Sequence, residues 1–200
     1  MASINYASHE INCKLVYYGP GMCGKTTNLQ FIHARIAQTK RGEMVSLATP
    51  GERTLYFDFL PLQLAEINGF MVKFSLYTVP GQAYYNATRK LVLRGADGII
   101  FVADSQWDMM QENVESLQNL ETNLLEYNTR LDDLPYILQY NKRDLPEVAP
   151  TWYMDYLLNI RGIPTFEAEA PQGRGVLDTL NALCRHVIRD LAYRSAAGSL

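Results

Sequence analysis

The chain is constrained most by one stretch, Gly19–Thr26, which reads GPGMCGKT and fits the pattern G-x-x-x-x-G-K-[ST]. The apolar run at residues 11–18 predicts a strand leading into this stretch, and the periodic apolar residues of 26–38 predict a helix leaving it. Strand, glycine-rich loop and helix are together the context that a phosphate cradle needs. The glycines let successive N–H groups turn inward, and the helix N-terminus adds partial positive charge. The stretch therefore predicts a loop that binds a nucleoside triphosphate.

Two side chains of this loop have predicted chemical roles. Lys25 would reach the β- and γ-phosphates, and the hydroxyl of Thr26 would ligate Mg²⁺. Cys23 is either a reactive thiol, because Lys25 and a helix N-terminus lower a thiol pKa, or a packing residue. The nucleotide-binding set expected here is Gly19, Gly21, Met22, Cys23, Gly24, Lys25, Thr26 and Thr27.

The order of the remaining segments predicts an α/β fold in three layers, of the P-loop NTPase class. Residues 54–61 and 70–77 read as strands joined by a tight turn at Asn68-Gly69, so the first of them should run antiparallel. Strands and helices then alternate, which predicts a six-stranded, mostly parallel sheet with one antiparallel strand. We expect a single domain over residues 1–200, with a polar lead-in at 1–10, a mobile loop at 43–53 and a flexible tail at 194–200.

Charge and cysteine content exclude several classes of function. The net charge of −3 offers no basic field for nucleic acid or for an acidic membrane. The three cysteines lie far apart without metal or disulfide spacing, which is typical of a reducing cytoplasm. No secretory leader, membrane span or lipidation signal is recognised, so we expect any membrane attachment to come through a partner.

A second motif indicates which base is bound. Asn141-Lys142-Arg143-Asp144 follows the strand predicted at 135–140, at the carboxyl edge where ligands bind in open α/β sheets. The carboxylate of Asp144 can accept hydrogen bonds from the ring N–H and the exocyclic amine of guanine, whereas adenine presents an acceptor at the ring position. The stem of Lys142 would lie along the base, and Asn141 would brace the loop. The nucleotide predicted is therefore GTP or GDP.

Between these motifs lies Thr78-Val79-Pro80-Gly81-Gln82, which resembles the D-x-x-G-Q segment of small GTPases. Gly81 can offer its N–H to the γ-phosphate, and Gln82 can orient the attacking water. Thr78 stands where the pattern has a magnesium-linked aspartate. Its hydroxyl could hold a metal-bound water, and Asp58 could supply the missing carboxylate or be an ordinary strand residue.

With these motifs in place, nearly the whole chain resembles the MglA family, bacterial Ras-like small GTPases that set cell polarity and control gliding or twitching motility. The segments that carry the resemblance are Asn5-Tyr6-Ala7, Glu10-Ile11-Asn12, Tyr17–Gly21, Gly24–Leu29, Ser46–Thr49, Glu52–Leu55, Phe57–Pro61, Val79–Gln82, Phe101–Ser105 and Gln139–Asp144. Threonine at position 78 is itself typical of this family.

The resemblance implies a GTP/GDP switch with Mg²⁺ as cofactor. It implies that Thr54 meets Mg²⁺ and the γ-phosphate, that Gln82 positions water, and that Ala168 offers its N–H to guanine. Arg53 matches a family arginine that acts in cis on the transition state, although a solvated loop arginine is the alternative. The implied partners are a GTPase-activating dimer of roadblock fold, called MglB in the family, and polarity or motility effectors. The chain itself is expected to be a cytoplasmic monomer that partners recruit to the cell pole.

Two segments depart from the family pattern, at Pro50-Gly51 and at Ala83-Tyr84-Tyr85. Tyr84 and Tyr85 are either exposed anchors for a partner or tyrosines packed back on the sheet. These departures leave a second hypothesis open, a guanine-nucleotide scaffold that does not hydrolyse GTP but docks polarity proteins. A third hypothesis, an ATP-using P-loop enzyme, conflicts with Asp144.

Overall fold

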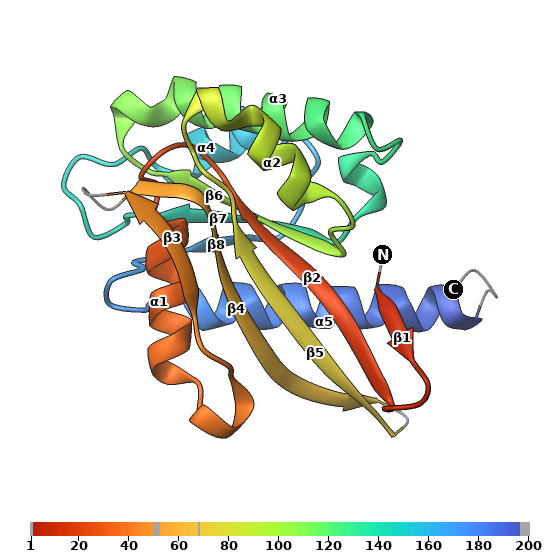
Figure 1. Ribbon diagram of the computed structural model, residues 1–200. Helices are drawn as coiled ribbons and strands as arrows, with labels where there is room; N and C mark the ends of the chain where they lie inside the picture. Colours follow the sequence, from red (N-terminus) through yellow and green to blue (C-terminus); the bar gives the residue numbers. More distant parts are fainter. Residues whose placement is uncertain (1, 50–52, 68, 197–200) are drawn as a thin grey trace.

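A computed structural model describes residues 2–49, 53–67 and 69–196. It contains an eight-stranded sheet in the order β3-β4-β5-β2-β6-β7-β8, with β1 paired to β2 (Figure 1). The strands are β1 (Ser3–Asn5), β2 (Glu10–Tyr18), β3 (Val45–Thr49), β4 (Arg53–Ile67), β5 (Phe70–Thr78), β6 (Gly98–Asp104), β7 (Tyr136–Asn141) and β8 (Thr165–Glu167). The neighbours β5, β2, β6, β7 and β8 pair in parallel, so the predicted α/β class is confirmed.

The hairpin of β4 and β5 supplies the antiparallel strand that the sequence predicts. Residues 59–67 of β4 pair antiparallel with residues 70–77 of β5. Burial alternates along β5, where Val72, Phe74, Leu76 and Thr78 point into the protein, as the period of two residues in a strand requires.

Two strands were not expected, and the predicted strand count of six is therefore too low. The segment 43–53, which we expected to be a mobile loop, contains β3, which pairs antiparallel with β4. The lead-in at 1–10 contains the three-residue strand β1 and the first residue of β2. Neither segment shows a clear hydrophobic period, so the sequence did not predict these strands. Short edge strands are stabilised by pairing with their neighbours more than by their own pattern.

Helices cover both faces of the sheet (Figure 1). The helices α1 (Lys25–Arg35) and α5 (Val176–Ala196) pack on one face through a core that includes Leu29, Ile32 and Leu180. The helices α2 (Asn86–Leu93), α3 (Met110–Leu125) and α4 (Thr151–Leu158) pack on the other face. The helix α5 continues through Ala196, so part of the expected flexible tail at 194–200 is helical.

The order of the strands determines where the site lies. The central strand β6 is buried at every residue, and its parallel neighbours place their carboxyl ends at the same edge of the sheet. At that edge β2 leads into Gly19–Thr26, β5 leads into Val79–Gln82, and β7 ends at Asn141. The three motifs singled out from the sequence therefore meet at one edge.

Candidate nucleotide site

The predicted phosphate-binding loop, Gly19–Thr26 (the phosphate loop below), has the backbone shape that its glycines predict. Gly24 has a φ of 99°, and a Cβ there would lie 2.2 Å from Nδ2 of Asn141, so no other residue fits without displacing that side chain. The ammonium of Lys25 is buried and donates hydrogen bonds to the carbonyl oxygens of Gly19, at 2.9 Å, and Pro20, at 2.5 Å. Lys25 is thus held within the loop, and α1 begins at the same residue.

The segment after β5 lies directly against this loop. A Cβ at Gly81 would come within 2.5 Å of both the Cα and the nitrogen of Gly21. Only a residue without a side chain allows so close an approach. The predicted γ-phosphate residue Gly81 is therefore brought to the phosphate loop, and the predicted water-positioning residue Gln82 follows it directly in the chain.

A buried carboxylate stands beside the hydroxyl predicted to hold Mg²⁺. Asp58 is 0% exposed, and its Oδ2 accepts hydrogen bonds from Oγ1 of Thr26, at 2.6 Å, and from Oγ1 of Thr78, at 2.7 Å. Ser46 donates a hydrogen bond to the other carboxylate oxygen. Asp58 lies on β4, which neighbours β5 and its Thr78, so a carboxylate from the adjacent strand lies beside the hydroxyl of Thr78.

The oxygen atoms around Thr26 are suitable ligands for a magnesium ion that also binds phosphates. A hydroxyl and a carboxylate are the hard oxygen ligands that Mg²⁺ prefers, and it usually keeps few protein ligands in phosphate sites. Within residues 2–49, 53–67 and 69–196, no group of three His, Cys, Asp or Glu side chains could hold a metal ion. The sequence named Asp58 only as one alternative, and Ser46 was missed because its pairing with Asp58 depends on the unexpected strand β3.

Asn141 connects the phosphate loop to the segments that the sequence predicts to recognise the base. Its Nδ2 donates a hydrogen bond to the carbonyl of Cys23 at 2.8 Å, and its Oδ1 accepts one from the N–H of Ala170 at 3.0 Å. The side chain of Asn141 is buried, so both bonds are shielded from water. The bracing role expected for Asn141 thus has a geometric basis.

Lys142 is fixed by a partner that the sequence analysis missed. Its ammonium lies 2.5 Å from Oδ2 of Asp104, which is buried at the end of β6, and donates a hydrogen bond to Oε1 of Gln106 at 3.1 Å. Lys142 also has a positive φ of 65°, which turns the chain sharply at the end of β7. The signal that could have revealed Asp104 is its position at the carboxyl end of a buried parallel strand, at the same edge as the two motifs.

The two groups expected to contact the base, the carboxylate of Asp144 and the N–H of Ala168, differ in their accessibility. Asp144 is exposed at this edge, with Nε2 of Gln172 at 3.5 Å from its Oδ2. The N–H of Ala168, in contrast, donates to the carbonyl of Tyr140 at 2.8 Å, so this N–H is committed to the sheet and not available for guanine. The expectation for Ala168 is therefore wrong, and the loop after β8 reaches the phosphate loop two residues later, through Ala170.

Several predicted residues are placed only in part. Arg53 and Thr54 are the first residues of β4, opposite Thr49 and Ala48 of β3, and their side chains lie outside what the structure describes. Met22 is exposed with a positive φ, and Thr27 is half-buried in the first turn of α1. Of the two departures from the family pattern, Pro50-Gly51 lies outside the described residues.

The two tyrosines after Gln82 differ in exposure. Tyr84 is 84% exposed, whereas Tyr85 is half-buried, and their rings meet edge to face with centroids 5.9 Å apart. Tyr84 therefore matches the alternative of an exposed aromatic and Tyr85 matches it only partly. An exposed tyrosine next to Gln82 is available to a protein partner.

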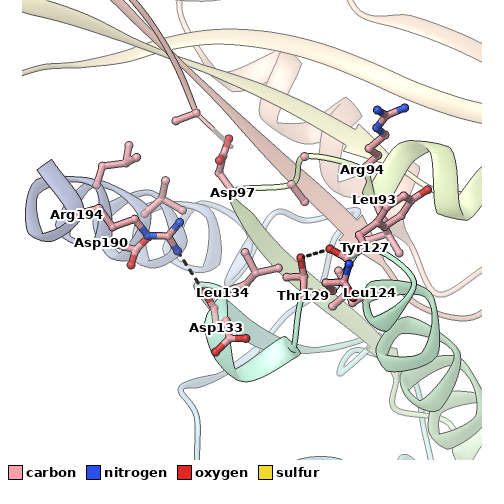
Figure 2. A pocket seen from close by; sticks show the side chains of 16 residues that line it. Leu93, Arg94, Asp97, Leu124, Tyr127, Thr129, Asp133, Leu134, Asp190 and Arg194 are labelled. Carbon is pink, nitrogen blue, oxygen red and sulfur yellow. Dashed lines mark hydrogen bonds and ion pairs between the residues drawn. The ribbon is translucent and has the colours of Figure 1, made fainter. Parts of the chain in front are cut away.

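Figure 2 shows a cavity of about 420 Å³ whose lining includes residues 93–97. These residues directly precede β6, so the cavity lies at the amino end of that strand, opposite the end where the three motifs meet. Its labelled side chains include Asp97, which precedes β6, together with Asp133 and the ion pair of Asp190 with Arg194. Burial raises the pKa of the Asp97 carboxyl, which accepts a hydrogen bond from the N–H of Lys14 at 2.7 Å. Because the carboxyl ends of the parallel strands point away from this cavity, it is not the nucleotide site.

Comparison with known proteins agrees with the geometry. The chain is 56% identical over 191 residues to the Mutual gliding-motility protein MglA of Myxococcus xanthus (strain DK1622), covering 96% of this chain and 98% of that protein. No protein-family model matches the chain. In the described part of the chain, no helix is long and apolar enough to cross a membrane. Identity at this level over almost the full length of both chains means that the chain belongs to the MglA family of small GTPases.

Proposed function

We propose that the protein is a GTP-binding and GTP-hydrolysing switch that controls bacterial cell polarity and motility. The observation that carries this proposal is the double hydrogen bond of Asn141, which ties the phosphate loop at Cys23 to the base-recognition segments at Lys142 and Ala170. These two hydrogen bonds join the proposed triphosphate loop and the proposed guanine-recognition motif into one site. The name of the Myxococcus relative, a gliding-motility protein, supports the role in motility.

In the proposed site each ligand group has its own protein partner. The N–H groups of Gly19–Thr27 and the ammonium of Lys25 bind phosphate oxygens, where the start of α1 adds partial positive charge. The carboxylate of Asp144 accepts the two guanine N–H donors, and the stem of Lys142, anchored by Asp104, supports the base plane. A carboxylate placed opposite the ring acceptor of adenine loses at least one hydrogen bond, which gives the selectivity.

Hydrolysis in this proposal depends on positioning and electrostatics. Gln82 orients the water, the N–H of Gly81 holds the γ-phosphate, and Arg53 supplies positive charge in cis in the transition state. The hydroxyls of Thr26 and Thr54 would hold Mg²⁺, which would supply positive charge to the phosphates. The hydroxyl of Thr26 donates its hydrogen to Oδ2 of Asp58 at 2.6 Å, so the residue that would hold Mg²⁺ has a buried carboxylate as its hydrogen-bond partner.

The proposed partners follow from the family and from the exposed surface near Gln82. We propose a roadblock-fold GTPase-activating dimer and polarity or motility effectors, with Tyr84 as an exposed anchor beside the site. The chain would act as one cytoplasmic domain and a monomer, and its partners would bring it to the cell pole.

Nucleotide affinity and phosphate release, measured on one preparation, test this proposal. Fluorescent GDP and GTP should bind tightly, and a fluorescent adenine nucleotide should not. Phosphate release from GTP should be slow for the protein alone and increase in the presence of a roadblock-fold dimer. Lys25→Ala is the matched variant, because it removes the buried ammonium that contacts the loop, and it should abolish binding.

Three outcomes distinguish the hypotheses. Tight guanine binding without any phosphate release, alone or with the dimer, would favour the scaffold that docks polarity proteins. A preference for the adenine nucleotide would contradict the role of Asp144. Binding that survives Lys25→Ala unchanged would place the nucleotide elsewhere.

A further inference from the structure

A cluster of buried and half-buried polar side chains joins the start of α2 to α3 and to the strand that enters the phosphate loop. Oδ1 of Asn86, the first residue of α2, accepts hydrogen bonds from Nδ2 of Asn119, at 3.1 Å, and of Asn123, at 2.9 Å. The hydroxyl of Tyr18, which directly precedes Gly19, donates to Oδ1 of Asn119 at 2.5 Å and accepts from Nδ2 of Asn123 at 3.1 Å. The first turn of α2 is thereby fixed to two other elements.

The burial of two members of this cluster makes its arrangement specific. Tyr18 and Asn123 are both 0% exposed, and burial is the main cause that raises the pKa of the Tyr18 hydroxyl. A buried polar group that loses its partner costs about 1–3 kcal/mol, so the cluster resists partial rearrangement. In these contacts Asn86 acts only as an acceptor, through one oxygen that two amides share.

Arg89 extends the cluster from α2 back to Gln82. Arg89 lies one turn after Asn86 and is 5% exposed, and its guanidinium carbon lies 5.9 Å from the centre of the Tyr18 ring. Its Nη2 donates to the carbonyl oxygen of Gln82 at 3.4 Å, and the N–H of Tyr85 donates to the same oxygen at 3.2 Å. The helix that the asparagines fix therefore also holds the backbone of Gln82.

We propose that Asn86 and Arg89 are positioning residues for Gln82 in GTP hydrolysis. The inference rests on the proposed function, because the placement of Gln82 matters only if Gln82 orients the attacking water. The position of Gln82 can vary little, because the preceding Gly81 lies in backbone contact with Gly21. A shift of α2 therefore changes the distance between Gln82 and the phosphate loop. Misplacement by about 1 Å can cost on the order of 10² in rate.

The decisive comparison is between Asn86→Ala and Asn86→Asp. Alanine removes the shared acceptor, whereas aspartate keeps an acceptor oxygen for the amides of Asn119 and Asn123. The added negative charge would stand three residues before Arg89 on the same helix, a spacing that places both side chains on one face. Hydrolysis under single-turnover conditions, alone and with a roadblock-fold dimer, should fall roughly 10- to 100-fold for Asn86→Ala and for Arg89→Ala. Asn86→Asp should restore it, and GDP affinity should keep its wild-type value in all three variants.

Lys90→Ala is the matched control on the same helix. Lys90 forms an ion pair with Glu126 at 2.5 Å and is not part of the cluster, so its loss removes a charge from α2 without touching Asn86 or Arg89. It should hydrolyse GTP at the wild-type rate. Hydrogen exchange of the amides of residues 82–89 should become faster in Asn86→Ala and stay unchanged in Lys90→Ala.

The outcomes separate this inference from the proposed function. Wild-type protein that binds GTP but never hydrolyses it would overturn the proposed switch and this role together. Normal wild-type hydrolysis with an undiminished rate in Asn86→Ala, or with no recovery in Asn86→Asp, would overturn the inference alone. A parallel loss of GDP affinity in Asn86→Ala would also overturn it, because that result indicates general disruption of the site.

Discussion

At the scale of single residues, the surroundings of a side chain decide its chemistry more than the motif that contains it. Sγ of Cys23 lies 3.5 Å from the ammonium of Lys25, an arrangement that by itself activates a thiol. Cys23 is nevertheless fully buried, and burial raises the pKa of its thiol by more than the charge of Lys25 lowers it. The thiol is therefore protonated at neutral pH, and packing is the role that the structure supports.

The cysteines give a first prediction. At neutral pH the native protein should not react with iodoacetamide at any of its cysteines, because all are buried and burial raises the pKa of both Cys13 and Cys184 to about 12. Mass spectrometry should find no label in the native protein and complete labelling in denaturant. Labelling of Cys23 in the native protein at the rate of a free thiol would show that its pKa is low.

Gln82 gives the second prediction at this scale. Gln82→Leu removes the amide that would orient water but keeps the volume of the side chain, so it should reduce dimer-stimulated phosphate release on the order of 10²-fold or more. Affinity for GDP should not change, because no phosphate group of GDP needs that amide. Stimulated release that survives the substitution would remove Gln82 from the mechanism.

At the scale of elements, the strand β4 has a role beyond pairing in the sheet. Asp58 of β4 accepts hydrogen bonds from the hydroxyls of Thr26, at the start of α1, and Thr78, at the end of β5. A carboxylate beside the proposed magnesium ligand thus belongs to the antiparallel strand of the hairpin. The position of β4 is consequently coupled to the phosphate loop, which the element order alone does not indicate.

The third prediction concerns this coupling. Asp58→Asn removes the negative charge and should raise the Mg²⁺ concentration needed for tight GDP binding by about 10- to 100-fold, as is usual when a partner of a metal ligand is lost. The measurement is the dissociation rate of fluorescent GDP against Mg²⁺ concentration. Ser46→Ala, which removes one neutral donor to Asp58, is the matched control and should have a smaller effect. Equal Mg²⁺ dependence in wild type and Asp58→Asn would make Asp58 an ordinary strand residue.

At the scale of the whole molecule, the proposed ligand would connect segments that are far apart in the sequence. The phosphate loop, the Gly81 segment and the Asn141 segment come from different strands of one sheet. A ligand that binds only the folded protein stabilises it by about 4 kcal/mol at 1,000 times its dissociation constant. In a chain of 200 residues this corresponds to a rise in melting temperature on the order of 10 °C.

The fourth prediction is that this rise depends on the base. GDP with Mg²⁺ should raise the melting temperature and ADP should not. Asp144→Asn should melt at the wild-type temperature without nucleotide, because Asp144 is exposed, and should lose most of the rise with GDP. An equal rise with ADP, or a full rise in Asp144→Asn, would exclude guanine recognition by this carboxylate.

Much of the fold was predictable because its signals are local. The buried strand β6 is an apolar run, and the glycine loop and the Asn141 motif each follow a strand, so their meeting at one edge follows from parallel topology. The unexpected strands β1 and β3 are short and lie at the margins of the sheet, where pairing with a neighbour replaces a sequence pattern.

The site was predictable down to residue type but not to individual bonds. The motif at Asn141 identified the bracing residue, but only the sheet pairing reveals that the N–H of Ala168 is already bonded to Tyr140. In the same way, Asp58 and Thr78 lie 20 residues apart, and their contact depends on the register of β4 against β5. Contacts across strands are a property of the register, which the spacing of motifs along one chain does not contain.

The two hydrogen bonds of Asn141 have a consequence for protein engineering. Because one side chain supports the carbonyl of Cys23 and the N–H of Ala170, a designer who moves either loop to accept a different base also moves the other. Gly24 tightens this constraint, because any Cβ there would press on the amide of Asn141. Under the proposed assignment of the site, base preference should therefore be altered at exposed Asp144, whereas redesign through Asn141 would move the phosphate loop and the loop after β8 together.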